Sequence, residues 1–245
     1  MSSAASKRKI RLIHTSDTHL GDDFGGQVAE AAFRAVVDAV PRLGGEMLLL
    51  AGDIFDNARV PDEVVEFFLE QVGRLSVPAV LLPGNHDLYA EGSVYHRQLF
   101  RSGPSNLHIF TRPEGGIIAF PELTLEVWGR AMPYHAPEFK PLAGMPSSHD
   151  GRWLVALAHG HFHFPHDVER RSSPIFPWEV AQATCDYLAL GHWERHEDVS
   201  QGRVKAAYSG SPRGPSRSDP LGAVAVVDLD PICGVQLSRA PLVMM

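Results

Sequence analysis

The sequence has little cysteine, no long apolar run and no excess of positive charge, and each absence excludes a class of protein. Its two cysteines, Cys185 and Cys233, are too few for a disulfide framework. The N-terminal residues lack the apolar segment of a secretory signal. No apolar stretch approaches the roughly 20 residues that a membrane helix needs. We therefore expect a cytoplasmic protein that does not enter a membrane.

The charge balance bears on the partners of the protein. The formal net charge is -7 at pH 7, with 22 lysines and arginines against 29 aspartates and glutamates. This argues against indiscriminate binding of nucleic acid, although one positively charged groove is compatible with it. The length of 245 residues is enough for one large core. We expect a single domain over residues 1–245, without internal repeats and without a separate capping domain.

Apolar runs and helical patterns alternate in the first part of the chain. Short runs rich in β-branched and leucine residues predict buried strands at 10–15, 47–51 and 78–82. Apolar residues at helical spacing predict helices at 28–40 and 62–75. Alternation of this kind is typical of βαβ units with parallel strands. The sequence therefore predicts an α/β fold.

The rest of the chain predicts strands with little helix between them. Three of these, at 107–110, 116–120 and 123–128, are expected to be antiparallel and to make the sheet mixed. The others are expected at 153–158, 187–190, 204–209, 223–229 and 235–239. Residues 209–219 form one long turn-rich loop.

Polar motifs follow five of the predicted strands. They are Asp17-Thr18-His19, Gly52-Asp53-Ile54-Phe55-Asp56, Gly84-Asn85-His86-Asp87, His159-Gly160-His161 and Gly191-His192-Trp193-Glu194. Ligands bind at the carboxyl ends of the strands in open α/β sheets, so these motifs should converge in space. Carboxylate and amide oxygens that alternate with imidazoles suit a pair of divalent metals that hold a phosphate.

The order of these motifs resembles the calcineurin-like metallophosphoesterase superfamily over residues 10–229. The segments Gly52–Asp56, Tyr187–His192 and Tyr208–Pro212 are similar to SbcD-type DNA double-strand-break-repair exonucleases. This resemblance implies a four-layer α/β/β/α sandwich, in which two mixed sheets are flanked by helices. It also implies two divalent metal ions, Mn²⁺ first, with Fe²⁺ or Zn²⁺ as alternatives.

The resemblance assigns ligands to both metals. Asp17 and His19 would hold the first ion, and Asp53 would bridge the two ions, because a shared anion offsets their repulsion. The second ion would be held by Asn85, His159 and His192.

The resemblance also assigns the catalytic groups. A hydroxide between the metals would be the nucleophile, and His86 would protonate or neutralise the leaving oxygen. Asp56 would orient His86, since a carboxylate behind an imidazole sets its tautomer and stabilises its cation. Asp87 is expected to serve structure, as a cap or as a partner behind the ligands.

Two ligand positions have alternatives. His159 comes directly after its strand and is the expected ligand, with His161 as the competitor. The family usually reads Gly-His-x-His where this chain has Glu194 at the last position. Glu194 is therefore the expected ligand of the first metal. The alternatives are that Glu194 is an exposed charge, that His196 reaches in through a bulge or that the first metal is weakly held.

Several functions are compatible with such a site. Arg213 is the candidate for binding the substrate phosphate, and Arg217 lies in the same loop. The leading hypothesis is a Mn²⁺-dependent phosphodiesterase or nuclease that acts on DNA, with an ATPase partner by analogy to the repair nucleases. The alternatives are a phosphatase or pyrophosphatase for a small nucleotide and a non-catalytic scaffold. The sequence leaves the oligomeric state open.

Overall fold

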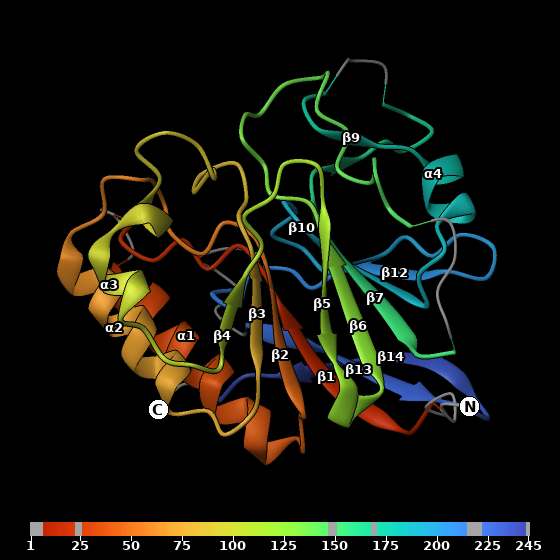
Figure 1. Ribbon diagram of the computed structural model, residues 1–245, viewed down its shortest axis with the longest axis horizontal. Helices are drawn as coiled ribbons and strands as arrows, with labels where there is room; N and C mark the ends of the chain where they lie inside the picture. Colours follow the sequence, from red (N-terminus) through yellow and green to blue (C-terminus); the bar gives the residue numbers. More distant parts are fainter. Residues whose placement is uncertain (1–6, 23–25, 147–150, 168–170, 215–221, 244–245) are drawn as a thin grey trace.

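Two six-stranded sheets form the centre of the computed structural model, which describes residues 7–22, 26–146, 151–167, 171–214 and 222–243 (Figure 1). The first sheet has the order β14 (Gly234–Pro241), β13 (Ala223–Asp230), β1 (Ile10–Thr15), β2 (Met47–Ala51), β3 (Ala79–Leu82) and β4 (Leu107–Ile109). The second has the order β11 (Glu197–Asp198), β12 (Lys205–Tyr208), β10 (Tyr187–Gly191), β7 (Trp153–His159), β6 (Leu125–Gly129) and β5 (Gly116–Phe120). Each sheet contains parallel and antiparallel pairs, which confirms the predicted α/β fold with two mixed sheets.

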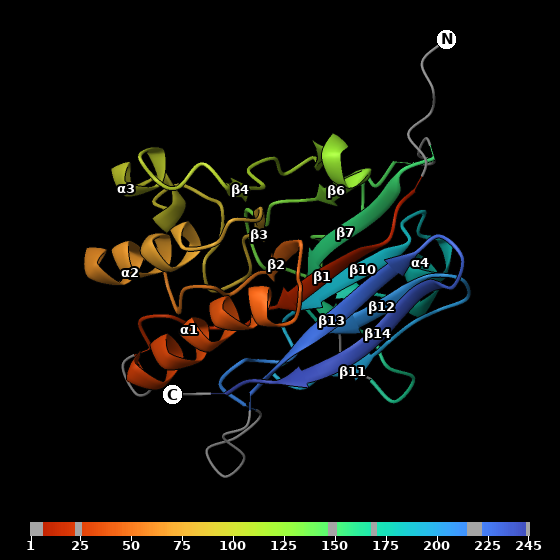
Figure 2. The same cartoon turned by 90° about the horizontal axis from the view of Figure 1, so that it is seen from below.

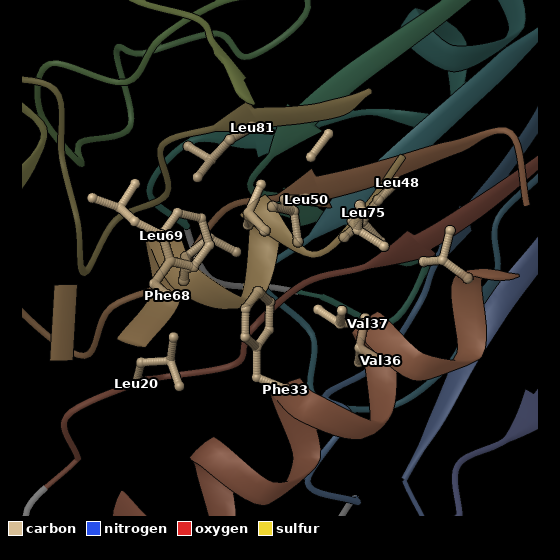
Figure 3. Packing of buried hydrophobic residues seen from close by; sticks show 14 of the residues in the cluster. Leu20, Phe33, Val36, Val37, Leu48, Leu50, Phe68, Leu69, Leu75 and Leu81 are labelled. Carbon is tan, nitrogen blue, oxygen red and sulfur yellow. The ribbon is translucent and has the colours of Figure 1, made fainter. Parts of the chain in front are cut away.

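Helices cover the face of the first sheet that points away from the second sheet (Figures 1 and 2). They are α1 (Gly26–Arg42), α2 (Asp62–Gly73) and the short α3 (Gln98–Arg101), which follows a 3₁₀ turn, η1 (Val94–His96). The apolar side of α1 packs against α2, where the ring centroids of Phe33 and Phe68 are 5.3 Å apart (Figure 3). Within the described residues, no helix combines the length and apolar character needed to cross a bilayer.

The central strands β1, β2, β3 and β13 of the first sheet are largely buried on both faces, so their residues alternate between two cores. Leu12 and Leu49 belong to the core between the two sheets. Ile13 and Leu50 point the other way, into the core beneath the helices. Successive side chains of a strand point to opposite faces, which explains why these strands read as continuous apolar runs in the sequence.

The outer face of the second sheet has a thinner cover. Among the described residues, α4 (Pro177–Gln182) is the α-helix on this side, and it packs Val180 against Leu154 and Leu188. The rest of the cover comes from irregular segments and the short parallel pair β8 (His161–Phe162) and β9 (Pro174–Ile175) (Figure 1). The fourth layer of the expected sandwich is therefore mostly loop.

The expectation that the three middle strands are antiparallel holds for β5 and β6, which pair with each other, and is wrong for β4. β4 pairs in parallel with β3 in the first sheet, and β6 pairs in parallel with β7 in the second. Only the pairing of β5 with β6, which a 3₁₀ turn, η2 (Pro121–Leu123), connects, is antiparallel among the described pairings of these strands. The chain crosses from one sheet to the other between β4 and β5, and local sequence patterns do not record such a crossing.

Candidate metal centre

The carboxyl ends of the predicted strands meet at one end of the sandwich. β1, β2 and β3 are parallel neighbours in the first sheet, and β7 and β10 are parallel neighbours in the second. Gly191 at the end of β10 allows the two sheets to approach here, because a Cβ at this position would overlap the carbonyl oxygen of Ala51. The polar motifs from both sheets are thereby brought together.

The loops after β1 and β2 hold their polar residues in left-handed backbone conformations. The amide of Asp17 donates to the carbonyl of Gly52 (3.0 Å), and that of His19 donates to the carbonyl of Asp53 (3.1 Å). Asp17, His19, Asp53 and His192 are four of the six non-glycine residues with positive φ in the described chain. Such conformations are energetically costly and concentrate at functional sites. Their occurrence at four predicted ligands therefore supports a functional site here.

Asp87 braces the loops that carry these residues. Its buried carboxylate accepts hydrogen bonds from the amides of Gly84 (2.6 Å), Ile54 (2.7 Å) and Phe55 (3.1 Å). The hydroxyl of Tyr95 also donates to it, at 2.6 Å. Asp87 therefore couples the loop after β3 to the loop after β2.

The residues predicted to hold the second metal form one cluster. Nε2 of His159 lies 3.2 Å from Oδ2 of Asp53 and 3.0 Å from Oδ1 of Asn85. Nδ1 of His192 lies 2.9 Å from the same amide oxygen of Asn85. Nδ1 of His159 donates to the carbonyl of Ala51 (2.9 Å), which turns Nε2 toward the cluster.

Charge in this cluster also fits a bound cation. Burial lowers the pKa of His159, but the negative charge and hydrogen bond of Asp53 outweigh it and raise the value to about 9. Burial lowers the pKa of His192 to about 3, so this imidazole is neutral and able to act as a ligand. A divalent ion between these atoms would take the place of the proton on His159.

Three of the residues predicted to hold the first metal are also together. One ligand atom from each of Asp17, His19 and Asp53 lies within 4.8 Å of the others, and all three residues are buried. Burial raises the pKa of Asp17 to about 6, against the opposing charge of His159, and the charge of Asp53 adds to the rise. Two buried carboxylates this close are stabilised by a cation, so the donor set fits a divalent metal.

His86 and Asp56 are adjacent, but their contact differs from the expected one. Nδ1 of His86 donates to the backbone carbonyl of Asp56 (2.8 Å), whereas the Asp56 carboxylate lies 3.9 Å away. That carboxylate is closer to Nδ1 of His19, at 3.4 Å. The His86 ring packs edge-on against the His19 ring, with centroids 4.6 Å apart, and the His86 amide donates to Asp53 (2.8 Å).

The residues at the two ligand positions with alternatives have different surroundings. His161 directs Nε2 to the carboxylate of Asp167 (2.9 Å), while His159 lies in the cluster. Glu194 is exposed and lines the same cavity as Asp17 and His19. In the described residues, the groups able to hold a metal include neither Glu194 nor His196.

Most of the predicted metal ligands line a cavity of about 320 Å³. Arg213 borders it and donates from Nη1 to the carboxylate of Asp22 at 2.8 Å. Arg217 lies outside the described residues. The lining residues are Asp17, His19, Asp22, Asp53, Asp56, Asn85, His86, His192, Glu194 and Arg213.

The motifs in the sequence did not point to His135. Its ring centroid lies 5.7 Å from that of His192, and its Nδ1 is 3.1 Å from the hydroxyl oxygen of Ser173. His135 follows β6, a strand with no polar motif at its end, so its position after a predicted strand was the only signal.

Comparison with known proteins agrees with this geometry. Residues 10–195 match the family model of the calcineurin-like phosphoesterases. The chain belongs to this family. The resemblance that the motifs predicted is thereby confirmed. The predicted metal ligands, from Asp17 to Glu194, lie within the matched residues.

Curated relatives include proteins of the SbcD type. One subunit of the nuclease SbcCD of Bacillus subtilis (strain 168) is 26% identical over 262 residues, covering 91% of this chain and 67% of the relative. The uncharacterized metallophosphoesterase YhaO of the same organism is 25% identical over 225 residues, covering 82% of this chain and 53% of the relative. The chain thus spans about half to two thirds of the length of these two relatives.

Solved structures share the fold at low sequence identity. A dimetal phosphatase from Danio rerio has a TM-score of 0.58 at 10% identity, covering 96% of this chain and 99% of that one. An archaeal phosphodiesterase has a TM-score of 0.53 at 13% identity, covering 95% of this chain and 100% of that one. These similarities show the metallophosphoesterase fold.

Proposed function

We propose that the chain is a phosphodiesterase that cleaves DNA with two bound divalent metal ions. Mn²⁺ is the proposed ion, and Fe²⁺ and Zn²⁺ are the alternatives. The observation that carries the proposal is the pair of ligand clusters that share Asp53 at the base of a cavity, with the exposed His86 at its edge. The proposed ligands are Asp17, His19, Asp53, Asn85, His159, His192 and Glu194.

The metals would activate a water molecule and neutralise charge on the substrate phosphate. His86 would supply the proton to the leaving oxygen. Because a carbonyl oxygen only accepts, the hydrogen bond to Asp56 keeps a hydrogen on Nδ1 and leaves Nε2 for the substrate. The Asp56 carboxylate at 3.9 Å would stabilise the imidazolium before it gives up its proton.

DNA as the substrate is supported by the relative named as part of a nuclease. Arg213 at the cavity supports it as well, since an arginine at this position can contact a phosphate oxygen. By the same analogy we propose an ATPase as the partner protein.

A second candidate is a phosphatase or pyrophosphatase for a small nucleotide. It is favoured by the cavity lining, where five carboxylates accompany Arg213; they belong to Asp17, Asp22, Asp53, Asp56 and Glu194. Such a lining repels a polyanionic strand outside the metal site more than it repels a single phosphate group.

Hydrolysis of three substrates by the Mn²⁺-loaded protein separates the two candidates. The substrates are bis(p-nitrophenyl) phosphate, p-nitrophenyl phosphate and labelled single-stranded DNA. We expect cleavage of the DNA and of the diester. Strong monoesterase activity without DNA cleavage would refute the nuclease and support the second candidate.

A variant of His86 tests the proton donor in the same assays. We expect His86→Ala to lower DNA cleavage by about 10²-fold or more, the typical contribution of a general acid. The loss on bis(p-nitrophenyl) phosphate should be much smaller, because p-nitrophenolate leaves without protonation. His166→Ala, at an exposed histidine stacked on Phe164, is the control. An equal loss on both substrates would rule out the acid role.

A further inference from the structure

His135 lies on the second-metal side of the site without belonging to any of the motifs. Its ring packs at 5.7 Å from the ring of His192, measured between centroids. His192 lines the cavity of the candidate metal centre, so the His135 side chain lies beside a proposed ligand of the second metal.

A contact with Ser173 anchors the His135 side chain. Nδ1 of His135 lies 3.1 Å from Oγ of Ser173, a fully buried residue with a φ of 48°. The amide of Ser173 donates to the carbonyl of Ala136 (2.9 Å), and its carbonyl accepts from the amide of His161 (3.0 Å). Ser173, which is buried and has a strained backbone, thus links the loop that contains His135 to the segment that follows His159.

The contact with Ser173 engages Nδ1 of the ring and leaves Nε2 to face a ligand. The serine hydroxyl has a second, weak acceptor in the thioether sulfur of Met132, at 3.9 Å. In the neutral tautomer whose Nδ1 accepts from the hydroxyl, the ring hydrogen is on Nε2, and that nitrogen is a donor.

That donor is available to a ligand. His135 is an exposed residue, and its Nε2 has no hydrogen-bond partner in the part of the chain that the structure describes. Arg213, which lines the cavity, is held by Asp22, whose own amide donates to the carbonyl of His19 (3.2 Å). A nitrogen-bearing side chain is therefore anchored near a proposed ligand of each metal.

We propose that His135 is a substrate-binding residue that donates a hydrogen bond from Nε2 to a phosphate oxygen on the second-metal side. This inference rests on the proposed function, since it requires that a phosphate occupies the site. It adds a contact that comes from the loop after β6, a strand that supplies none of the proposed metal ligands.

Binding of inorganic phosphate and of thymidine 5′-monophosphate to the Mn²⁺-loaded protein tests the proposal by calorimetry. We expect His135→Ala to weaken both by about tenfold, the usual value of a hydrogen bond to a charged group. His135→Gln, which keeps an N–H donor, should recover most of this affinity. The affinity and stoichiometry of Mn²⁺ should match those of the wild-type protein.

Kinetics with bis(p-nitrophenyl) phosphate provide a second readout. We expect His135→Ala to raise KM by about tenfold while kcat changes less than about twofold, because the contact binds substrate and is not the proton donor. His166→Ala should change neither the kinetics nor phosphate binding. Ser173→Ala should give an intermediate loss of phosphate affinity, with its thermal unfolding measured to check the fold.

Two outcomes would overturn the proposal. One is phosphate affinity in His135→Ala equal to that of the wild-type protein. The other is a parallel loss of Mn²⁺ affinity, which would show that the residue acts through His192. Failure of the proposed function gives a different result. The wild-type protein would then cleave no phosphodiester, while the phosphate affinities of the wild-type protein and of His135→Ala can still be compared.

Discussion

At the scale of single residues, the two kinds of oxygen in Asp56 have different neighbours. Its backbone carbonyl holds Nδ1 of His86, and its carboxylate lies nearer to Nδ1 of His19 than to His86. A carboxylate behind a metal-binding imidazole raises the basicity of that ligand. The side chain of Asp56 should therefore influence the first metal more than it influences the orientation of His86.

Asp56→Asn tests this division of roles. We expect the affinity for the more weakly bound Mn²⁺ to fall about tenfold, as is typical when a partner behind a ligand is lost. DNA cleavage at saturating Mn²⁺ should fall only a few-fold, because the backbone carbonyl still holds His86. Calorimetric titration with Mn²⁺ and rates at saturating metal give the two values.

Asp38→Asn is the matched control, since Asp38 is a surface residue paired with Arg74. A large loss of rate at saturating metal, with unchanged Mn²⁺ affinity, would show instead that the carboxylate acts on His86.

At the scale of the elements, the site depends on loops that follow strands rather than on the strands themselves. Asp87 after β3 accepts hydrogen bonds from the loop after β2 and from Tyr95 of η1. These bonds hold Asp53 and Asn85 at fixed positions on two neighbouring loops. The loop geometry should therefore exist before any metal binds.

Asp87→Ala should destabilise the metal-free protein and weaken Mn²⁺ binding together. Loss of a buried, multiply bonded carboxylate leaves several amides without an acceptor, and we expect about 3 kcal/mol or more of lost stability. Tyr95→Phe removes only one of the donors and should cost about 1 kcal/mol. Urea unfolding without metal and calorimetry with Mn²⁺ measure the two effects. Unchanged stability of Asp87→Ala would contradict this assignment.

At the scale of the whole molecule, a buried polar contact joins the two sheets. His14 on β1 and Tyr187 on β10 are both fully buried, and Nδ1 of His14 lies 2.9 Å from the tyrosine hydroxyl. Burial, and then the charge of His196, lower the pKa of His14 to about 3. The contact between the two sheets therefore contains a buried, neutral histidine.

Stability should fall as the pH falls because of His14. The unfolded chain has an ordinary histidine pKa of about 6.5, so between pH 6.5 and 3 it binds more protons than the folded chain. This contribution to stability is complete above pH 6.5 and is lost on acidification, by up to about 1.4 kcal/mol per pH unit.

His14→Asn keeps an acceptor for Tyr187 but does not titrate. We expect its urea unfolding free energy to depend less steeply on pH than that of the wild-type protein between about pH 7 and 4.5. His96→Asn, at an exposed histidine, should retain the wild-type slope. Equal slopes for His14→Asn and the wild-type protein would exclude this role for His14.

The sequence by itself determined most strands and the residues that gather at their ends. A buried strand that ends in a polar residue is a local pattern, so Asp17, Asp53 and Asn85 could be placed beside one another without coordinates. The parallel arrangement of β1, β2 and β3 followed from the helices between them, because a parallel connection needs a crossover. The family could be recognised from the same motifs.

Only the tertiary structure decided the features that depend on distant neighbours. Sequence patterns show that a strand exists but not which sheet it joins, and so the parallel pairings of β4 and β6 were missed. The position of His135 depends on Ser173, 38 residues away in the chain. The nearness of the Asp56 carboxylate to His19 depends on two loops that pack together. Each of these contacts is made in space by segments whose local sequences carry no record of it.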